Sequence, residues 1–369
     1  TTADNNTAVG KGALTANTTG TSNTALGRES LDANTTGDNN TGIGSRALGG
    51  NTTGENNTAV GERALFANTT ADDNTAVGYV ALLSATTASN NTAIGALALA
   101  QNTTADDNVG VGYQALTTNT TGASNTGVGR NALANNVAVG RMAMRDNTTG
   151  TPNTAIGHQA MISNTEGGSN VAVGKGSLDA NTTGGSNIAI GVDALGANTT
   201  ASNNVAIGKD SLGANTTGAN ITAVGAASLD ANTTASNNTA VGKSSLGTNT
   251  TGDLNVANGT SALFANTTGS QNVAMGHNTL GANTTGNNNT AIGYVAMNAN
   301  TTGGNNTALG FGALDANTTA SGNTAVGYQS LGAATGGGNT CVGAQAGDGI
   351  ITGVNNVIVG VASDVVSSS

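Results

Sequence analysis

Bulky side chains are almost absent from this chain of 369 residues. It has no Trp, three Phe and four Tyr, and its one proline is Pro152. A chain of this length would ordinarily form two globular domains, but so few large apolar residues cannot fill thick cores. Gly, Asn, Thr and Ala dominate instead. Because the apolar residues recur at fixed positions, the composition favours repetitive order over low-complexity disorder.

Charge and cysteine are also scarce. Charged residues make up 8% of the chain, and the net charge is −10. No run of Lys or Arg is present, which argues against binding to nucleic acid. The single cysteine, Cys341, cannot form an intrachain disulfide, and we expect it to be a small buried residue. With no apolar run that could span a bilayer, no signal peptide and no initial Met, we expect an excised part of a longer protein, without membrane contact of its own.

One sequence motif recurs along the chain with a period of seventeen residues, as in the step from Asn6 to Asn23. Its consensus is N-T-A-V-G-x-x-A-L-x-A-N-T-T-G-x-x, and aligning on the first Asn gives 22 anchors, from Asn6 to Asn356. A short fixed period is typical of a solenoid, in which each unit contacts only its neighbours. We therefore predict an all-β fold, a parallel β-solenoid (β-roll) of about 22 coils. It should run continuously over residues 1–360 for roughly 100 Å, with a C-terminal transition segment at 361–369.

Each unit is expected to contain short strands joined by turns. In the first unit Thr7 and Val9 alternate with Ala8, so Thr-Ala-Val is predicted to be a strand with Thr7 and Val9 on one face and Gly10 at the corner. Leu14 is assigned to a second short extended segment, and Asn-Thr-Thr-Gly to the return turn. Stacked coils then predict two buried aliphatic ladders, through Val9 and Leu14, together with amide ladders of Asn.

One unit is shorter than the others. The step from Asn125 to Asn136 is six positions shorter than the regular period, because the Asn-Thr-Thr-Gly turn is missing. A coil at 125–135 cannot close the same outline without it. We predict a local narrowing or kink there rather than a domain boundary, and we expect insertion of Thr-Thr-Gly-Ala-Ser-Asn to restore a regular coil.

A thin core favours association between chains. Two or three buried aliphatic side chains per coil supply little hydrophobic stabilisation, and Ala8, Ala25, Ala59 and Ala76 form a small-residue face on the strand. Since Ala lets backbones approach closely, this face is predicted to pack between the protomers of a homotrimer. Uncapped coil ends would also allow end-to-end association into a fibre.

Several copies of the motif resemble known repeats. "NNVAIG" at 203–208, "NNVAVG" at 135–140 and "SNVAVG" at 169–174 resemble the N-S-V-A-I-G repeat of trimeric autotransporter adhesin heads. The longer motif "NTAVGYVALLSATTASN" at 74–90 resembles repeats of bacterial and phage tail-fibre-type proteins. The resemblance implies a left-handed β-roll, a trimer and a location outside the cell, on a cell surface or in a virion fibre.

Large and cationic side chains gather at one place in the unit. Nine of the ten Lys and Arg lie one or two positions after the Gly of the tetrad, and aromatic residues take the first of those positions. Such an edge could bind host glycans or matrix proteins, although bulky residues also accumulate wherever only solvent limits their size. The candidate binding edge consists of Tyr79, Tyr113, Lys175, Tyr294, Phe311 and Tyr328.

Catalytic chemistry is not expected. His158 and His277 are too far apart in the repeat to share a metal, and the adjacent Asp72 and Asp73 point opposite ways on an extended chain. We therefore predict no enzyme activity, no cofactor and no metal site. The predicted function is an extracellular structural fibre or adhesin segment, a rigid multivalent shaft for surface attachment. The alternatives are a phage tail-fibre shaft and an ice-binding solenoid with ordered Thr.

Overall fold

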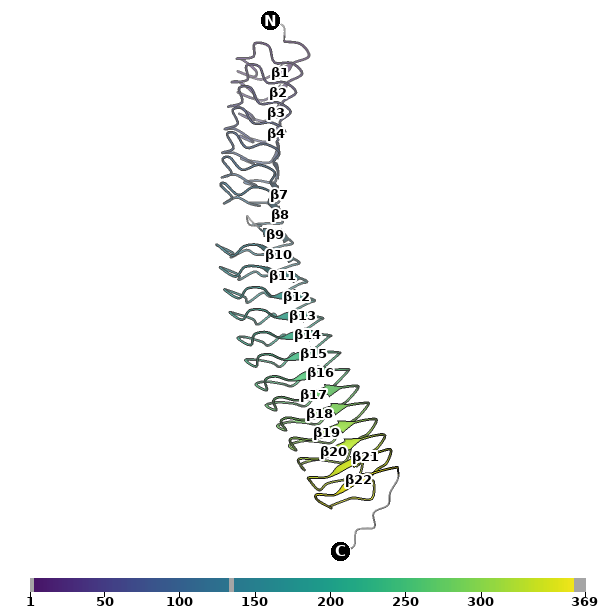
Figure 1. The fold of residues 1–369 in the computed structure, drawn as a ribbon. Coiled ribbons are helices and arrows are strands. Elements are labelled where there is room, and N and C mark those ends of the chain that lie inside the picture. Colours follow the sequence, from purple (N-terminus) through teal and green to yellow (C-terminus); the bar gives the residue numbers. More distant parts are fainter. Residues whose placement is uncertain (1–2, 133–135, 362–369) are drawn as a thin grey trace. The chain divides into compact units, whose positions relative to one another are not determined.

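The computed structural model describes residues 3–132 and 136–361. Contacts divide the chain into an N-terminal unit, residues 1–166, and a C-terminal unit, residues 167–369. Each unit is a parallel β-solenoid with a repeat of about 17 residues, and the described residues contain no helix. The predicted fold class is therefore confirmed. In Figure 1 every coil carries one short strand at the same place in its outline.

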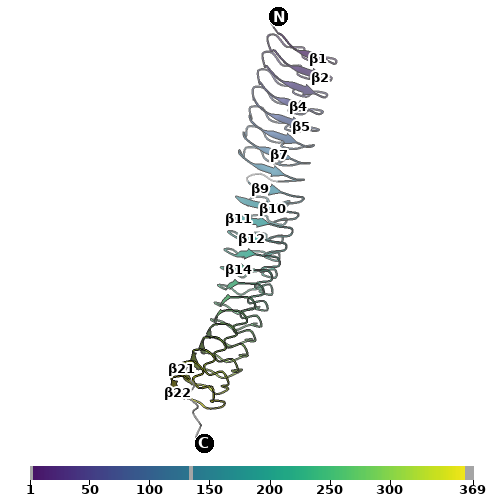
Figure 2. The same cartoon turned by 90° about the vertical axis from the view of Figure 1, so that its right-hand side faces the viewer.

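The strands of the N-terminal unit stack on one side of successive coils (Figure 2). They are β1 (Thr7–Val9), β2 (Thr24–Leu26), β3 (Thr41–Ile43), β4 (Thr58–Val60), β5 (Thr75–Val77), β6 (Thr92–Ile94), β7 (Val109–Val111), β8 (Thr126–Val128), β9 (Asn136–Val139) and β10 (Asn153–Ile156).

The C-terminal unit repeats the same arrangement. Its strands are β11 (Asn170–Val173), β12 (Ile188–Ile190), β13 (Val205–Ile207), β14 (Thr222–Val224), β15 (Thr239–Val241), β16 (Val256–Asn258), β17 (Val273–Met275), β18 (Thr290–Ile292), β19 (Thr307–Leu309), β20 (Thr324–Val326), β21 (Thr340–Val342) and β22 (Val357–Val359).

Within each unit, a strand pairs in parallel with the next strand along the chain. Thr222 of β14 lies opposite Thr239 of β15, its equivalent one repeat later. The hydrogen bonding continues through the turns, where the Leu14 N–H donates to the Ser30 carbonyl at 3.0 Å and the Thr18 N–H to the Thr35 carbonyl at 2.9 Å. A coil is thus bonded to its neighbour around most of its outline, which offsets the small hydrophobic core.

The strand has the opposite face inward from the one predicted. Its central Ala is buried, as in Ala25 and Ala206 at 0% exposure. The flanking aliphatic residues face outward, with Val9 55% and Ile190 38% exposed. The prediction of a buried ladder through Val9 is therefore wrong. The predicted trimer contact through the Ala face is also wrong, because that face lies inside its own coil.

The space opposite the strand explains this inversion. Three strands, β3, β7 and β8, have Gly in place of the inward Ala, and a Cβ added at Gly127 would lie 2.8 Å from Cγ of Leu116. At Gly42 it would lie 2.6 Å from the hydroxyl of Ser30. Leu from the facing turn already fills the interior, so only a side chain of Ala size fits beneath the strand. The inward position of β21 is Cys341, which is buried as predicted.

The Leu ladder is buried as predicted, but its backbone is not extended. Leu31, Leu48 and their equivalents are 0% exposed. Leu14 has φ 54° and Leu212 φ 54°, in the left-handed region. The stretch from Lys11 to Ala16 forms consecutive turns. The prediction of a second extended segment is wrong, because left-handed backbone at Leu is what directs this side chain inward within so short a coil.

Two ladders of buried Asn run parallel to the Leu ladder, as the sequence predicts. In the first, the anchor Asn23 accepts the Asn40 N–H through its side-chain oxygen at 2.9 Å. In the second, the Asn of Asn-Thr-Thr-Gly bonds its equivalent in the preceding coil, as in Asn51 Nδ2 to Asn34 Oδ1 at 2.8 Å. Most of these amides also donate to a turn carbonyl, as Asn23 Nδ2 does to the Gly37 carbonyl at 2.8 Å, so the ladders satisfy polar groups that the thin coil buries.

The short coil leaves the sheet uninterrupted. Thr126 of β8 pairs with Val137 of β9 in the same parallel register as the regular coils, although the connection between them is shorter. The narrowing or kink predicted for 125–135 stays a prediction, because the described residues show only that the strands on either side keep their register. Residues 133–135 of that coil lie outside the described residues. So does the predicted transition segment 361–369, apart from Val361.

Candidate binding surfaces

The predicted binding edge is assembled in part. In the C-terminal unit, His277, Tyr294, Phe311 and Tyr328 occupy the first corner position of successive coils and form one stack. Adjacent ring centroids are 5.3, 5.4 and 5.4 Å apart, with interplanar angles of 9–15°. Tyr294, Phe311 and Tyr328 are about half exposed. The stack includes three of the predicted residues and adds His277, which the sequence places at the same corner position but which was not among the predicted binding residues.

The other predicted residues stand apart from this stack. Tyr79 and Tyr113 lie in the N-terminal unit with Ala96 at the equivalent position between them. Tyr113 is instead covered by Arg130, whose guanidinium carbon is 5.4 Å from the ring centroid. Lys175 is exposed, and its neighbour one coil later is the aliphatic Val192. The candidate edge is therefore several separate features rather than one surface.

Stacking determines what the aromatic column can bind. Within the stack each ring covers the face of the next, so the flat faces that favour sugar rings are largely occupied. The ring edges and the hydroxyls of Tyr294 and Tyr328 remain available. Such an array presents hydrogen-bonding groups at the coil spacing, which suits a repetitive partner that makes many weak contacts.

Acidic residues that directly follow the Asn-Thr-Thr-Gly or Asn-Thr-Thr-Ala turn have a structural role that sequence reasoning missed. The Asp38 carboxylate accepts the Thr21 N–H at 2.6 Å, and the Asp253 carboxylate accepts the Ser236 N–H at 2.6 Å. Asp72 and Asp106 accept backbone N–H groups in the same way. Ser takes this role in other coils, as where the Ser202 hydroxyl accepts the Gly185 N–H. The alternation of Asp, Ser and Asn at this position was the available signal, because these residues share a short side-chain acceptor.

Three other carboxylates of the C-terminal unit are partly buried. Desolvation raises the pKa of Asp179, Asp230 and Asp315 above the ordinary value. Asp193 raises the pKa of Asp179 further, and Asp210 does the same for Asp230, since like charges disfavour ionisation.

These shifts predict that mild acid stabilises the C-terminal unit. Above the unfolded pKa the folded state binds more protons at these carboxyls, so the free energy of unfolding falls as pH rises through the window between the unfolded and folded values. Lowering the pH from about 7 to about 4.5 should raise the thermal midpoint of this unit. The triple variant Asp179→Asn, Asp230→Asn, Asp315→Asn should show a smaller rise. Hydrogen exchange of peptides from 167–361, recorded over a temperature series at each pH, gives the thermal midpoint of this unit in the native chain and in the triple variant. A midpoint of the native chain that falls on acidification would contradict the prediction.

The outward face of the strands carries a long row of apolar side chains, which Asn258 of β16 interrupts. In the C-terminal unit it carries Ile190, Ile207, Met275, Ile292 and Leu309 along one column, each at least 36% exposed. The parallel column, two residues earlier, alternates Thr with Val or Ile. Exposed apolar strips of this kind commonly mark surfaces that contact another molecule.

Cavities and clusters of ionisable residues do not extend the candidate binding surfaces. Among residues 3–132 and 136–361 no group of three His, Cys, Asp or Glu could hold a metal ion. The described part of the chain has no helix long and apolar enough to cross a membrane. Several cavities lie beside the short coil, in a region that the candidate edge does not include.

Comparison with known proteins does not assign the chain to a family. No family description matches it, and no curated protein is significantly similar to it.

Proposed function

We propose that this chain is a segment of an extracellular structural fibre or adhesin shaft, which sets distance and presents a repeated surface without catalysis or a cofactor. The observation that carries the proposal is the construction of both units from near-identical bonded coils. The outward strand positions carry similar side chains, mostly Thr, Val, Ile or Leu, at the coil spacing, whereas the corner residues vary from coil to coil. Rigidity and multivalency then follow from one sequence pattern. A cell-surface fibre and a virion tail fibre share these requirements.

The proposed assembly is a homotrimer that associates through the outward strand face. Val, Ile and Leu on this face are exposed in the single chain, whereas the small residues first considered for the contact lie inside it. Burying such columns in a trimer would remove apolar area from water at roughly 25 cal/mol per Å². The thin core of one coil makes this contribution valuable.

A single charge on this face should weaken self-association. Ile190→Lys places an ammonium group in the proposed contact, where its desolvation is unfavourable, and should raise the dissociation constant about tenfold or more. Val192→Lys is the matched control, because Val192 lies two residues away on the corner and is 39% exposed, against 38% for Ile190. Sedimentation equilibrium of the full chain measures the association. A monomeric native chain, or equal weakening by both variants, would contradict the trimer contact.

An adhesive role predicts that the aromatic stack retains a partner. The variant Tyr294→Ser, Phe311→Ser, Tyr328→Ser should lose at least about tenfold in binding on an array of glycans and matrix proteins, because avidity multiplies each lost contact. The control Tyr79→Ser, Tyr113→Ser removes aromatic residues outside the stack. If the native chain and the stack variant bind the array equally well, the aromatic stack is not adhesive and the segment acts only as a spacer.

The ice-binding alternative has its own signature. Its strand face would need regular pairs of Thr two residues apart, whereas the observed face pairs Thr with Val or Ile, as in Thr222 and Val224. Thermal hysteresis in a freezing assay would favour this alternative over the fibre.

A further inference from the structure

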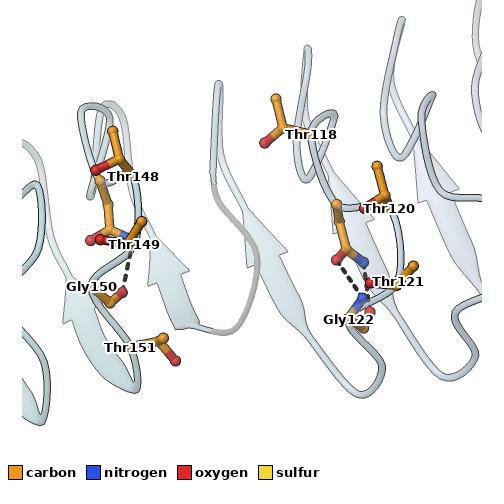
Figure 3. Close-up of a pocket in the computed structure, with 10 residues that line it drawn as sticks. Thr118, Thr120, Thr121, Gly122, Thr148, Thr149, Gly150 and Thr151 are labelled. Atoms are coloured by element: carbon orange, nitrogen blue, oxygen red, sulfur yellow. Dashed lines mark hydrogen bonds between the residues drawn. The ribbon is translucent and has the colours of Figure 1, made fainter.

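The missing turn of the short coil leaves a polar notch on the N-terminal unit. Its two walls are the Asn-Thr-Thr-Gly turns at 119–122 and 147–150, which face each other across a cavity of about 240 Å³ (Figure 3). Thr118 and Thr151 complete the lining. No charged or aromatic side chain lines it, so the notch offers only hydroxyls, amides and backbone groups.

A regular coil shows what the notch lacks. In the first coils, the N–H groups of Thr18 and Thr19 both donate to the Thr35 carbonyl of the next turn, at 2.9 and 3.2 Å. The Asn34 side chain also donates to Asn17 Oδ1 at 3.1 Å. The backbone of each turn therefore presents donors toward the following turn and acceptors toward the preceding one, whereas the amide ladder donates in the opposite direction.

At the notch this chain of bonds stops and then resumes. Thr120 still accepts from the Thr103 N–H at 3.1 Å, and the Thr148 N–H still donates to the Thr165 carbonyl at 2.9 Å. Among the described residues, however, the Thr120 N–H has no acceptor and the Thr148 carbonyl has no donor, although both groups are bonded in the regular coils before the notch. One wall is left with a free donor and the other with a free acceptor.

The side-chain ladder is already broken before the notch, because Ala85 replaces its Asn and Asn102 bonds only within its own turn. Asn119 does the same, with Nδ2 donating to the Gly122 carbonyl at 2.7 Å and Oδ1 accepting the Gly122 N–H at 3.1 Å. Across the notch, Asn147 donates to the Gly150 carbonyl at 2.9 Å. The two walls are two coil steps apart, about 10 Å, which is the room that one extended rung occupies.

We propose that this notch binds an extended peptide segment of the Asn-Thr-Thr-Gly type, supplied by another chain, in the place of the missing turn. The carbonyl of the guest residue that follows its Asn accepts from the Thr120 N–H, and the N–H of that residue donates to the Thr148 carbonyl. The guest Asn joins the amide ladder between Asn119 and Asn147. The partner is thus a polar segment that adds a rung by main-chain hydrogen bonding, as strands add to open sheet edges.

Hydrogen exchange of the full chain tests this proposal. The probe is the peptide acetyl-Ala-Asn-Thr-Thr-Gly-Ser-amide at millimolar concentration. The amides of segment 118–122 should exchange freely without it and slow by about tenfold or more with it. Exchange in β1 to β6 should not change. A control peptide with Ala in place of its Asn should protect much less, because it cannot join the ladder.

A filled notch provides the matched protein control. Aligned on the sequence repeat, the short coil lacks the six residues that precede Asn135, so Ala-Asn-Thr-Thr-Gly-Ser is inserted between Ala134 and Asn135 to supply the ladder Asn. This insertion differs by one position from the one first expected to restore the coil. The variant should protect 118–122 without peptide and show no response to it. No protection of the native chain, or equal protection by both peptides, would overturn the proposal, whether or not the variant folds.

Discussion

Gly225→Ala should destabilise the C-terminal unit by about 3 to 5 kcal/mol. Gly225 forms the corner after strand β14, where φ is +136°. A Cβ there would lie 2.5 Å from the carbonyl oxygen of Gly242 in the next coil. Two costs therefore add: a backbone conformation that only Gly adopts readily, and a clash with backbone that cannot move without breaking the stack. Urea unfolding followed by circular dichroism measures the loss.

The control for this substitution is Gly213→Ala. A Cβ at Gly213 would have its nearest contact at 3.4 Å, an ordinary van der Waals distance, and φ is not in the left-handed region. This variant should change the free energy of unfolding by less than about 1 kcal/mol. Equal losses from the two variants would show that the corner is not as tight as described.

Breaking the buried Asn ladder should cost about 2 to 5 kcal/mol per site. Asn232 donates to Asn215 Oδ1 at 2.9 Å and to the Ala235 carbonyl at 3.1 Å. It accepts from Asn249 Nδ2 at 3.2 Å. Asn232→Ala removes all three bonds while the partners stay buried. A lower urea midpoint is the expected result, and an unchanged midpoint would contradict the ladder's role.

The natural sequence contains the reciprocal case. Ala85 and Ala334 replace the ladder Asn in their coils, and Oδ1 of the preceding Asn, Asn68 or Asn317, has no partner. Ala85→Asn should therefore supply the missing donor and stabilise the N-terminal unit by about 1 kcal/mol. A lower free energy of unfolding for this variant would show that an Asn at position 85 cannot join the amide ladder.

Asn232→Asp distinguishes a hydrogen-bonding role from a packing role. At neutral pH the new carboxylate has no proton to donate to Asn215, so the variant should be destabilised. Burial raises the pKa of such a carboxyl, and its protonated form can donate, so stability should recover as pH falls. Asn237→Asp is the control, because Asn237 is exposed and Asp already occupies the equivalent positive-φ position at Asp73 and Asp107. Similar pH profiles for both variants would argue against the ladder.

Periodicity predicted the architecture because a solenoid repeats one solution. The fixed step between anchors placed the strands, the Leu ladder, the Asn ladders and the corner Gly from the sequence alone. The side of the strand that faces inward could not be predicted in the same way. A three-residue alternation shows only that Thr7 and Val9 share a face, and hydrophobicity favours burying Val. The volume already filled by the facing Leu decides otherwise.

The candidate surfaces were predicted less completely for a related reason. Tyr294, Phe311 and Tyr328 fell on consecutive coils, so their stacking followed from the register. The notch could not be predicted from the register, because it arises from backbone groups that are hydrogen-bonded in a regular coil and, among the described residues, unbonded beside the short coil. Similarly, Asp38 and Asp253 resemble a solvated acidic edge in the sequence, whereas each accepts a backbone N–H from the preceding coil.

The measurement that tests the stacked-coil architecture most directly is a spin-label ruler along one strand column. Nitroxide pairs are placed on outward Thr of the C-terminal unit, from Thr222 to Thr290, Thr307 or Thr324, in a Cys341→Ala background. The interspin distance should increase by about 4.8 Å for each added repeat, since one repeat advances the column by one strand spacing. Distances that fail to grow linearly with the number of repeats, or broad distributions typical of a disordered chain, would contradict a parallel solenoid with one coil per repeat.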